Sequence, residues 1–346
     1  MTALRRRRVA LALAAGILAV GLAVAFSASV GAQPISLAAA LAGADPDRAI
    51  LFGLRLPRAV VAAIVGCALA AAGTALQALL RNPLAEPFVL GVSGGAALGG
   101  SLVLVAAAGL GRIAGRAGEA LGTAPPVALG AIAGAILATV LVFGLGRISG
   151  RLVPEAALLV GIVFNSFVAG VITLMKMLVA PEQASRLTYW LVGAVGYESA
   201  GTQAWGAAAV AVAVAVLIAM SAQVNLLTLG DEEAATLGLD VRRARAWIFF
   251  AASAATGAAV ALAGMVGFVG LIVPHLVRRV VGPDHRLLIP ASALFGAAFL
   301  VLADALARLA FLPLGTEPPV GAVTAFLGGP FFLWLLRRSA RPEAGR

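Results

Sequence analysis

The chain has 346 residues, of which 62% are hydrophobic and only 12% are charged, and its mean hydropathy is +1.04. This apolar share is far above that of a soluble domain and predicts a protein that crosses a membrane several times, with membrane lipid around it. The net charge of +10 does not indicate a nucleic-acid partner, because the arginines form short clusters at the ends of apolar runs. The single cysteine, Cys67, excludes an intramolecular disulfide and a thiolate metal cluster.

Ten apolar runs follow one another along the chain and predict an all-α protein with ten transmembrane helices. The first follows Arg5–Arg8 and is interpreted as an uncleaved helix, because it is longer than the core of a signal peptide. A cleaved signal is the alternative, since residues 30–33 resemble a signal-peptidase site. The predicted spans are 9–30, 57–80, 88–108, 125–147, 156–178, 204–223, 246–265, 267–281, 287–310 and 319–336.

The basic residues predict the orientation of these spans. An even number of spans places both termini on one side, and most of the 25 basic residues fall on that side. By the positive-inside rule, both termini are expected in the cytosol. The longest polar segment between spans covers only residues 31–56, so residues 1–346 are predicted to form a single transmembrane domain with no soluble catalytic domain.

Few residues within the spans could carry chemistry. Asp304 and Arg308 are one helical turn apart and are predicted to pair on one face of the ninth span. His275 and His285 have too few potential ligands nearby for a metal site and are predicted to bind backbone groups freed around the neighbouring prolines. With no Ser/His/Asp arrangement and no paired carboxylates in mid-membrane, neither a catalytic residue nor a metal site is expected.

ATP binding is not expected on this chain. Lys176 is the only lysine, and no Gly-x-x-x-x-Gly-Lys loop surrounds it, so a Walker A phosphate site is missing from the sequence. If ATP drives this protein, another subunit must bind it.

Three stretches depart from the pattern of plain spans. Residues 264–285 begin as a span that is predicted to break at Pro274, and Arg278 and Arg279 follow. Residues 91–100 are rich in glycine, which predicts close packing between helix backbones. Residues 79–95 form a turn between two prolines that is interpreted either as a functional element or as a connector.

A short acidic helix is predicted at about residues 230–238. Asp231, Glu232 and Glu233 suit its first turn, and Gly238 suits its end. A helix of this length extends about 10 Å and cannot span a membrane. A partner surface is therefore the favoured interpretation, and a solvated loop helix is the alternative.

Several long segments, in this order, resemble the FecCD-type permeases, which are the membrane subunits of ATP-binding-cassette (ABC) importers for iron–siderophore complexes, haem and cobalamin. The segments are LRLPRAVVAAIVGCALAAAGTALQALLRNPLAEPFVLGVSGGAALG (54–99), NLLTLGDEEAATLGLDV (225–241), ALAGMVGFVGLIVPHLVRRVVGPDHRLLIP (261–290), LADALARL (302–309) and EPPVGAVTAFLGGPFFLWLL (317–336). With the spans between them, the resemblance covers nearly the whole chain.

The resemblance implies a type II ABC importer permease in the bacterial inner membrane. It implies a homodimer with one pore on the two-fold axis, no cofactor on this chain, and two cytosolic ATPase subunits that bind ATP and Mg. It also implies a periplasmic or lipid-anchored substrate-binding protein. The chelate is left open among the three classes.

The resemblance also assigns residues to three roles. Arg55, Arg58 and Arg308 would dock the binding protein at the outer face. Asn82 and Leu84 would help to close the cytosolic end of the pore, with Pro154 and Glu155 beside them. The residues that would couple the permease to the ATPase are Gly230, Asp231, Glu232, Glu233, Ala234, Leu237 and Gly238.

Two departures from the family pattern bear on these assignments. WLVGAV (190–195) stands where relatives often have Trp-x-x-Gly-Ser, and Pro154 and Glu155 stand where some relatives have small hydroxyl residues. An ion-coupled secondary carrier and a membrane-embedded enzyme are the alternatives from other functional classes. The carrier fits less well, because such proteins usually need titratable groups at the midplane of the membrane.

Overall fold

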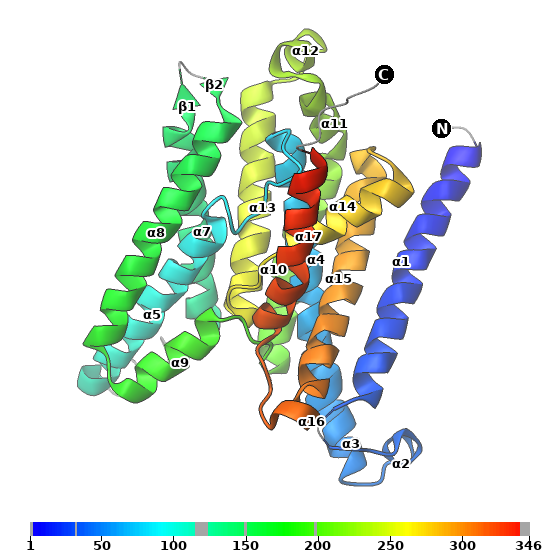
Figure 1. Ribbon diagram of the computed structural model, residues 1–346, viewed down its shortest axis with the longest axis vertical. Helices are drawn as coiled ribbons and strands as arrows, with labels where there is room; N and C mark the ends of the chain where they lie inside the picture. Colours follow the sequence, from blue (N-terminus) through cyan, green and yellow to red (C-terminus); the bar gives the residue numbers. More distant parts are fainter. Residues whose placement is uncertain (1–2, 32, 115–123, 149–150, 197–198, 340–346) are drawn as a thin grey trace.

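The computed structural model describes residues 3–31, 33–114, 124–148, 151–196 and 199–339. Its long helices run side by side along one axis (Figure 1). The first helix begins and the last helix finishes at the same end of this bundle, which we call the termini end; the opposite end is called the far end. The predicted all-α fold is confirmed.

Each predicted span overlaps one long helix, and the span 204–223 also reaches into the short helix α11 (Ser221–Leu229). The long helices are α1 (Ala3–Ser29), α4 (Leu56–Leu79), α5 (Val92–Ala114), α7 (Ala124–Leu145), α8 (Pro154–Leu178), α10 (Ala200–Ala219), α13 (Val241–Ala263), α14 (Val269–Val281), α15 (His285–Leu309) and α17 (Val320–Ser339).

A count of ten full membrane crossings is not confirmed. Eight helices in the described part of the chain are long and apolar enough to cross a membrane, and α5 contributes only a shorter apolar segment, Val92–Ala107. Helix α14 has 13 residues, which corresponds to about 20 Å, less than the hydrocarbon thickness of roughly 30 Å. The sequence therefore places the ten helices correctly, while a count of ten full crossings is not confirmed.

Short elements close the two ends of the bundle (Figure 1). The far end carries α2 (Leu37–Leu41), α3 (Asp47–Ile50), the π-helix η1 (Leu51–Arg55), α9 (Pro181–Leu191) and α16 (Phe311–Leu314). The termini end carries α11 (Ser221–Leu229), α12 (Asp231–Thr236) and two short antiparallel strands, β1 (Arg147–Ile148) and β2 (Arg151–Leu152).

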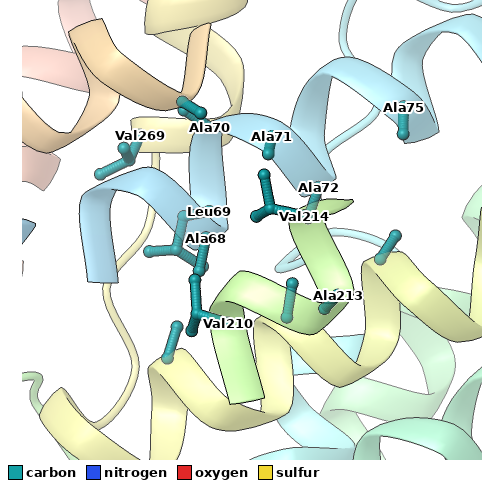
Figure 2. Close-up of a cluster of buried hydrophobic side chains, with 14 of the residues drawn as sticks. Ala68, Leu69, Ala70, Ala71, Ala72, Ala75, Val210, Ala213, Val214 and Val269 are labelled. Atoms are coloured by element: carbon teal, nitrogen blue, oxygen red, sulfur yellow. The ribbon is translucent and has the colours of Figure 1, made fainter. Parts of the chain in front are cut away.

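Helix α4 is the centre of the bundle and consists largely of small residues. Figure 2 shows its Ala68–Ala75 segment against Val210 and Val214 of α10 and Val269 of α14. A Cβ on Gly66 would lie 2.1 Å from the backbone oxygen of Gly296 in α15, so the two backbones are in direct contact. Such small-residue contacts let helices pack closely where lipid offers no hydrophobic driving force.

The glycine-rich segment 91–100 packs as predicted. A Cβ on Gly99 in α5 would lie 2.0 Å from the backbone oxygen of Gly130 in α7, and one on Gly95 would lie 2.5 Å from that of Gly134. The close approach of these two helices confirms the packing role of the glycines.

The predicted break at Pro274 is wrong, because α14 continues through this residue. Proline lacks the N–H that would bond to the carbonyl four residues earlier, and here the Gln77 Nε2 donates to that carbonyl, Gly270 O, at 3.1 Å. The chain instead breaks between α13 and α14, where Gly264 and Phe268 have φ values of 66° and 69°.

Candidate functional site

The acidic helix α12 lies at the termini end, beyond α11 and α13 (Figure 1). It begins after Gly230, whose φ of 139° suits only glycine, and its Ala234 is fully buried. Glu232 and Glu233 are exposed, and so is Leu237, at 60%. The helix is thus anchored on one side and offers acidic and apolar side chains on the other.

Asp231 joins α12 to two other parts of the chain. Its Oδ1 accepts a hydrogen bond from the Arg245 Nη2 of α13 at 2.6 Å and lies 3.6 Å from the Arg81 Nη2. Arg81 directly precedes the turn that begins at Asn82. Asp231 thus connects α12 with the start of that turn and with the first part of α13.

The turn after α4 is closed by a local hydrogen bond. Arg81 adopts a left-handed conformation with φ of 49°, and the Asn82 Oδ1 accepts a hydrogen bond from the Leu84 backbone N–H at 2.9 Å. This local bond closes an Asx turn around Pro83. Leu84 is half-buried. The sequence indicates the turn through Pro83 but not the ion pair of Arg81.

Pro154 and Glu155 begin α8 at the same end of the bundle, and the Glu155 side chain is exposed. In the described residues, no hydrogen bond or ion pair joins them to Asn82 or Leu84. The two pairs of predicted gate residues are therefore separate elements within one chain.

Glu86 is a buried carboxyl group that the sequence reasoning did not single out. Its side chain accepts a hydrogen bond from the backbone of Phe268, and burial raises its pKa to about 8. Since Phe268 lies at the break before α14, this contact fastens the turn 80–91 to the α13–α14 connection. The signal in the sequence is an acidic residue within a proline-bounded, apolar stretch.

A buried charge cluster lies at the far end. The Arg58 Nε and Nη2 donate to the Asp304 Oδ1 at 3.0 and 2.9 Å, and Arg58 also pairs with Glu317. The Arg308 Nε lies 3.3 Å from the Asp304 Oδ2, which confirms the predicted pairing one helical turn apart. Asp304 is thus shared between two arginines.

The remaining bonds of this cluster reach the end of α1. Arg308 donates to the backbone oxygens of Ser27 and Val30 at 3.1 and 3.0 Å, and Arg55 donates to that of Ala28 at 2.7 Å. All three predicted docking arginines are only 5–6% exposed. In the isolated chain they fasten α1, α4 and α15 together, and their docking role stays a prediction.

The two histidines lie near the termini end. The His285 Nδ1 lies 2.8 Å from the Asn225 Oδ1, which also accepts from the His285 backbone N–H at 2.9 Å. The predicted role of the His285 ring as a partner for freed backbone is therefore wrong, because a side chain on α11 takes it. His275 contacts the ring of Phe331 edge-on.

Helix α8 exposes a long apolar face. Leu159, Val163, Phe167 and Leu174 are each at least 60% exposed. Their spacings of four and seven residues place them on one side of the helix. Ser166 is also exposed on this helix, while Asn165 is half-buried and its Nδ2 donates to the Phe88 backbone oxygen at 2.7 Å.

Comparison with known proteins identifies a matching family and several similar permeases. The model of the FecCD transport family matches residues 10–338. The haemin transport system permease HmuU of Yersinia pestis is 36% identical over 296 residues, which is 86% of this chain and 85% of that protein. The cobalamin import system permease BtuC of Halobacterium salinarum is 39% identical over 308 residues, covering 88% of this chain and 79% of the relative.

A solved structure described as an inward-facing conformation of a metal-chelate type ABC transporter has the same fold. It matches with a TM-score of 0.78 and 27% identity, covering 95% of this chain and 99% of that one. The match over nearly the entire length, together with the two relatives, shows that the chain belongs to the FecCD transport family.

Proposed function

We propose that this chain is the permease subunit of an ATP-driven importer that moves a metal chelate of the iron–siderophore, haem or cobalamin type into a bacterial cytoplasm. The named permeases among its relatives support this class of cargo. The observation that carries the mechanism is the contact of Asp231 with both Arg81 and Arg245. The termini end is then the cytosolic end, and the membrane is the inner membrane.

In this mechanism, ATP and Mg bind to two separate cytosolic subunits, and α12 rests on the surface of one of them. Glu232, Glu233 and Leu237 are exposed and would form that contact. Movement of α12 would pull on Arg81 through Asp231 and so displace the turn at Asn82 and Leu84. A small motion at the ATPase would thereby open or close the cytosolic end of the pore.

The pore itself requires a second copy of the chain. We assign the exposed face of α8 to a homodimer whose two-fold axis carries the pore, because the polar and exposed Ser166 lies on the same side of the helix as Leu159 and Val163. Ser166 would then be among the few polar groups along the route. Pro154 and Glu155, at the start of the same helix, would lie at its cytosolic mouth.

The gate is testable by crosslinking. Leu84→Cys, in a background without Cys67, should crosslink between the two subunits when the cytosolic end is closed and much less when it is open. Leu145→Cys is the control, because this residue is 65% exposed at the end of α7 and is not assigned to the gate. Failure of Leu84→Cys to crosslink in every state of an intact dimer would make the turn a mere connector.

Docking of the external binding protein is proposed at the far end, around Arg58. Arg58 is buried, and its partner Glu317 is the more exposed member of the pair, with 31% of the side chain accessible. A carboxylate on a binding protein would reach Arg58 by replacing Glu317, because arginine can hold a carboxylate through two parallel bonds. Arg55 and Arg308 would support the site by fixing the neighbouring helix ends.

Glu317→Gln tests this docking mode without disturbing the buried Arg58–Asp304 pair. Removing the competing charge should strengthen the association of the binding protein, and the gain should be larger at low salt. Glu182→Gln, which changes another exposed carboxylate at the far end, is the control. Unaltered affinity in Glu317→Gln would exclude the displacement.

Transport assays separate this function from an ion-coupled carrier. The chain reconstituted with its ATPase and binding protein should take up a chelate only with hydrolysable ATP. Offering haemin, cobalamin and a ferric siderophore in parallel identifies the class of cargo. Uptake that is driven by an ion gradient in the absence of any ATPase would favour the carrier.

A further inference from the structure

A groove of about 710 Å³ opens between α7 and α13 at the termini end, next to α12. Its deeper part is apolar and is formed by Val140 and Phe143 of α7 and by Phe249 and Phe250 of α13. The proposed coupling uses the contact of Asp231 with Arg245 at its mouth but assigns no ligand to the groove itself.

The groove lies at the depth where lipid head groups meet acyl chains. The apolar spans that bound it end at Leu145 and begin at Val241. Phe143 and Phe250 therefore lie inside the hydrocarbon region, while Arg147 and Arg242 lie at its edge. Along α13, the nine residues between Val241 and Phe250 rise about 14 Å, which is about half of the hydrocarbon thickness.

The mouth of the groove is positively charged. Arg147, Arg242 and Arg245 line it together with one carboxylate, Asp231. Asp231 is engaged by Arg245 at 2.6 Å and by Arg81 at 3.6 Å. Within the described part of the chain, neither Arg147 nor Arg242 has a carboxylate within ion-pair distance, so the mouth keeps an excess of positive charge.

Two features indicate that the groove can hold a ligand: a hydrogen-bond donor that lacks a partner within the described segments of the chain, and open space beside a glycine. The buried Nε of Arg245 donates no hydrogen bond to any group in the described residues. A Cβ built on Gly144, which lines the groove, would meet no atom within 4 Å. An anionic oxygen could accept from the arginines at the mouth, while the space beside Gly144 would admit an apolar chain.

We propose that this groove binds one anionic phospholipid from the leaflet at the termini end. The phosphate would lie against Arg147 and Arg242, and one acyl chain would follow Val140 and Phe250 toward the middle of the membrane. Charge complementarity and the combination of a basic mouth with an apolar floor at membrane depth favour a lipid over a soluble anion. A basic pocket between helices is the form that such head-group sites take in membrane proteins.

The bound lipid would also affect the contact through which α12 is coupled to α13. It would neutralise Arg147, whose charge repels Arg245, the residue that holds Asp231 of α12. The proposal does not depend on which chelate is transported or on the direction of transport.

Native mass spectrometry of the purified assembly tests the proposal, with dioleoylphosphatidylglycerol as the probe and dioleoylphosphatidylcholine as the uncharged comparison. Each arginine near a membrane surface contributes roughly fivefold to the binding of an anionic lipid. Arg147→Gln with Arg242→Gln should therefore weaken binding by about 30-fold. Arg243→Gln is the matched control, because Arg243 is adjacent and exposed, pairs with Asp240 and does not line the groove.

A second pair of variants tests the apolar floor. Gly144→Phe should fill the groove and displace the lipid without a change of charge. Gly21→Phe on α1 is its control, because a Cβ there also meets no atom within 4 Å and the residue is far from the groove. Melting temperatures of all variants establish that they are folded.

Three results would overturn the proposal. The first is equal binding of the two lipids by the unchanged assembly, which would mean that the basic mouth does not select an anionic head group. The second is retention of the lipid by the double arginine variant or by Gly144→Phe. The third is competition by glycerol 3-phosphate or inorganic phosphate at the same concentration as the lipid, which would assign the site to a soluble anion.

Discussion

Glu86→Gln should change how the stability of the protein depends on pH. Burial raises the pKa of Glu86 from 4.5 to about 8, while the carboxyl of the unfolded chain keeps its ordinary value. One pKa unit corresponds to about 1.4 kcal/mol, so the difference amounts to about 5 kcal/mol. Glutamine is uncharged at every pH, and its oxygen can still accept the hydrogen bond from Phe268.

The direction of the effect follows from the raised pKa. Below about pH 4.5, both states hold the proton, and the folded protein keeps the full contribution of the neutral carboxyl. As the pH rises toward 8, the unfolded chain has lost its proton while the folded chain still retains it, so stability falls. The wild-type protein should therefore lose stability between pH 5 and pH 8, and Glu86→Gln should lose less.

Thermal unfolding in detergent at a series of pH values measures this difference. The melting temperatures of the two proteins should be similar near pH 5, and at pH 8.5 that of Glu86→Gln should be higher by several degrees. Glu182→Gln, at an exposed carboxylate in the first turn of α9, is the control and should follow the wild type. Parallel curves for wild type and Glu86→Gln from pH 5 to 8.5 would refute the reasoning.

Three further predictions concern the coupling link and the packing of the bundle. Asp231→Asn should lower the amount of substrate moved per ATP several-fold, while basal ATPase activity survives. Asp240→Asn, in an exposed pair with Arg243, is the control and should leave this ratio unchanged; equal coupling in both variants would contradict the link. Asp304→Asn should cost about 3–5 kcal/mol, because it leaves Arg58 and Arg308 buried without their shared carboxylate; a melting temperature close to that of the wild type would show that the cluster contributes little. Gly66→Ala should destabilise by about 1–3 kcal/mol through the clash with Gly296 O, and Gly21→Ala, at a position with open space, should be neutral or mildly stabilising in the same thermal assay.

The sequence predicts the helices well because each apolar run is long and is bounded by charge or proline. It fails at Pro274, since the cost of a proline inside a helix depends on what binds the freed carbonyl. That partner, Gln77, is 193 residues away along the chain. The number of full crossings is not confirmed, because α14 is too short to cross a membrane alone and other helices surround it.

In the charge clusters too, contacts between residues close in the sequence are predictable, and contacts between distant residues are not. The pairing of Asp304 with Arg308 follows from their spacing within one helix. The stronger partner of Asp304, Arg58, lies 246 residues away and belongs to the set that the sequence assigns to docking. Glu86 is an acidic residue between Pro83 and Pro87, and only the packed structure reveals that its side chain is buried.

ATP-dependent uptake by the reconstituted assembly tests the central claim most directly. Proteoliposomes that contain this chain, its ATPase subunits and its binding protein should accumulate a metal chelate only when ATP is supplied on the α12 side. Replacing both Glu232 and Glu233 with lysine should abolish accumulation while the membrane fold remains intact. Accumulation without ATP, or unchanged accumulation in the Glu232→Lys, Glu233→Lys variant, would contradict the account.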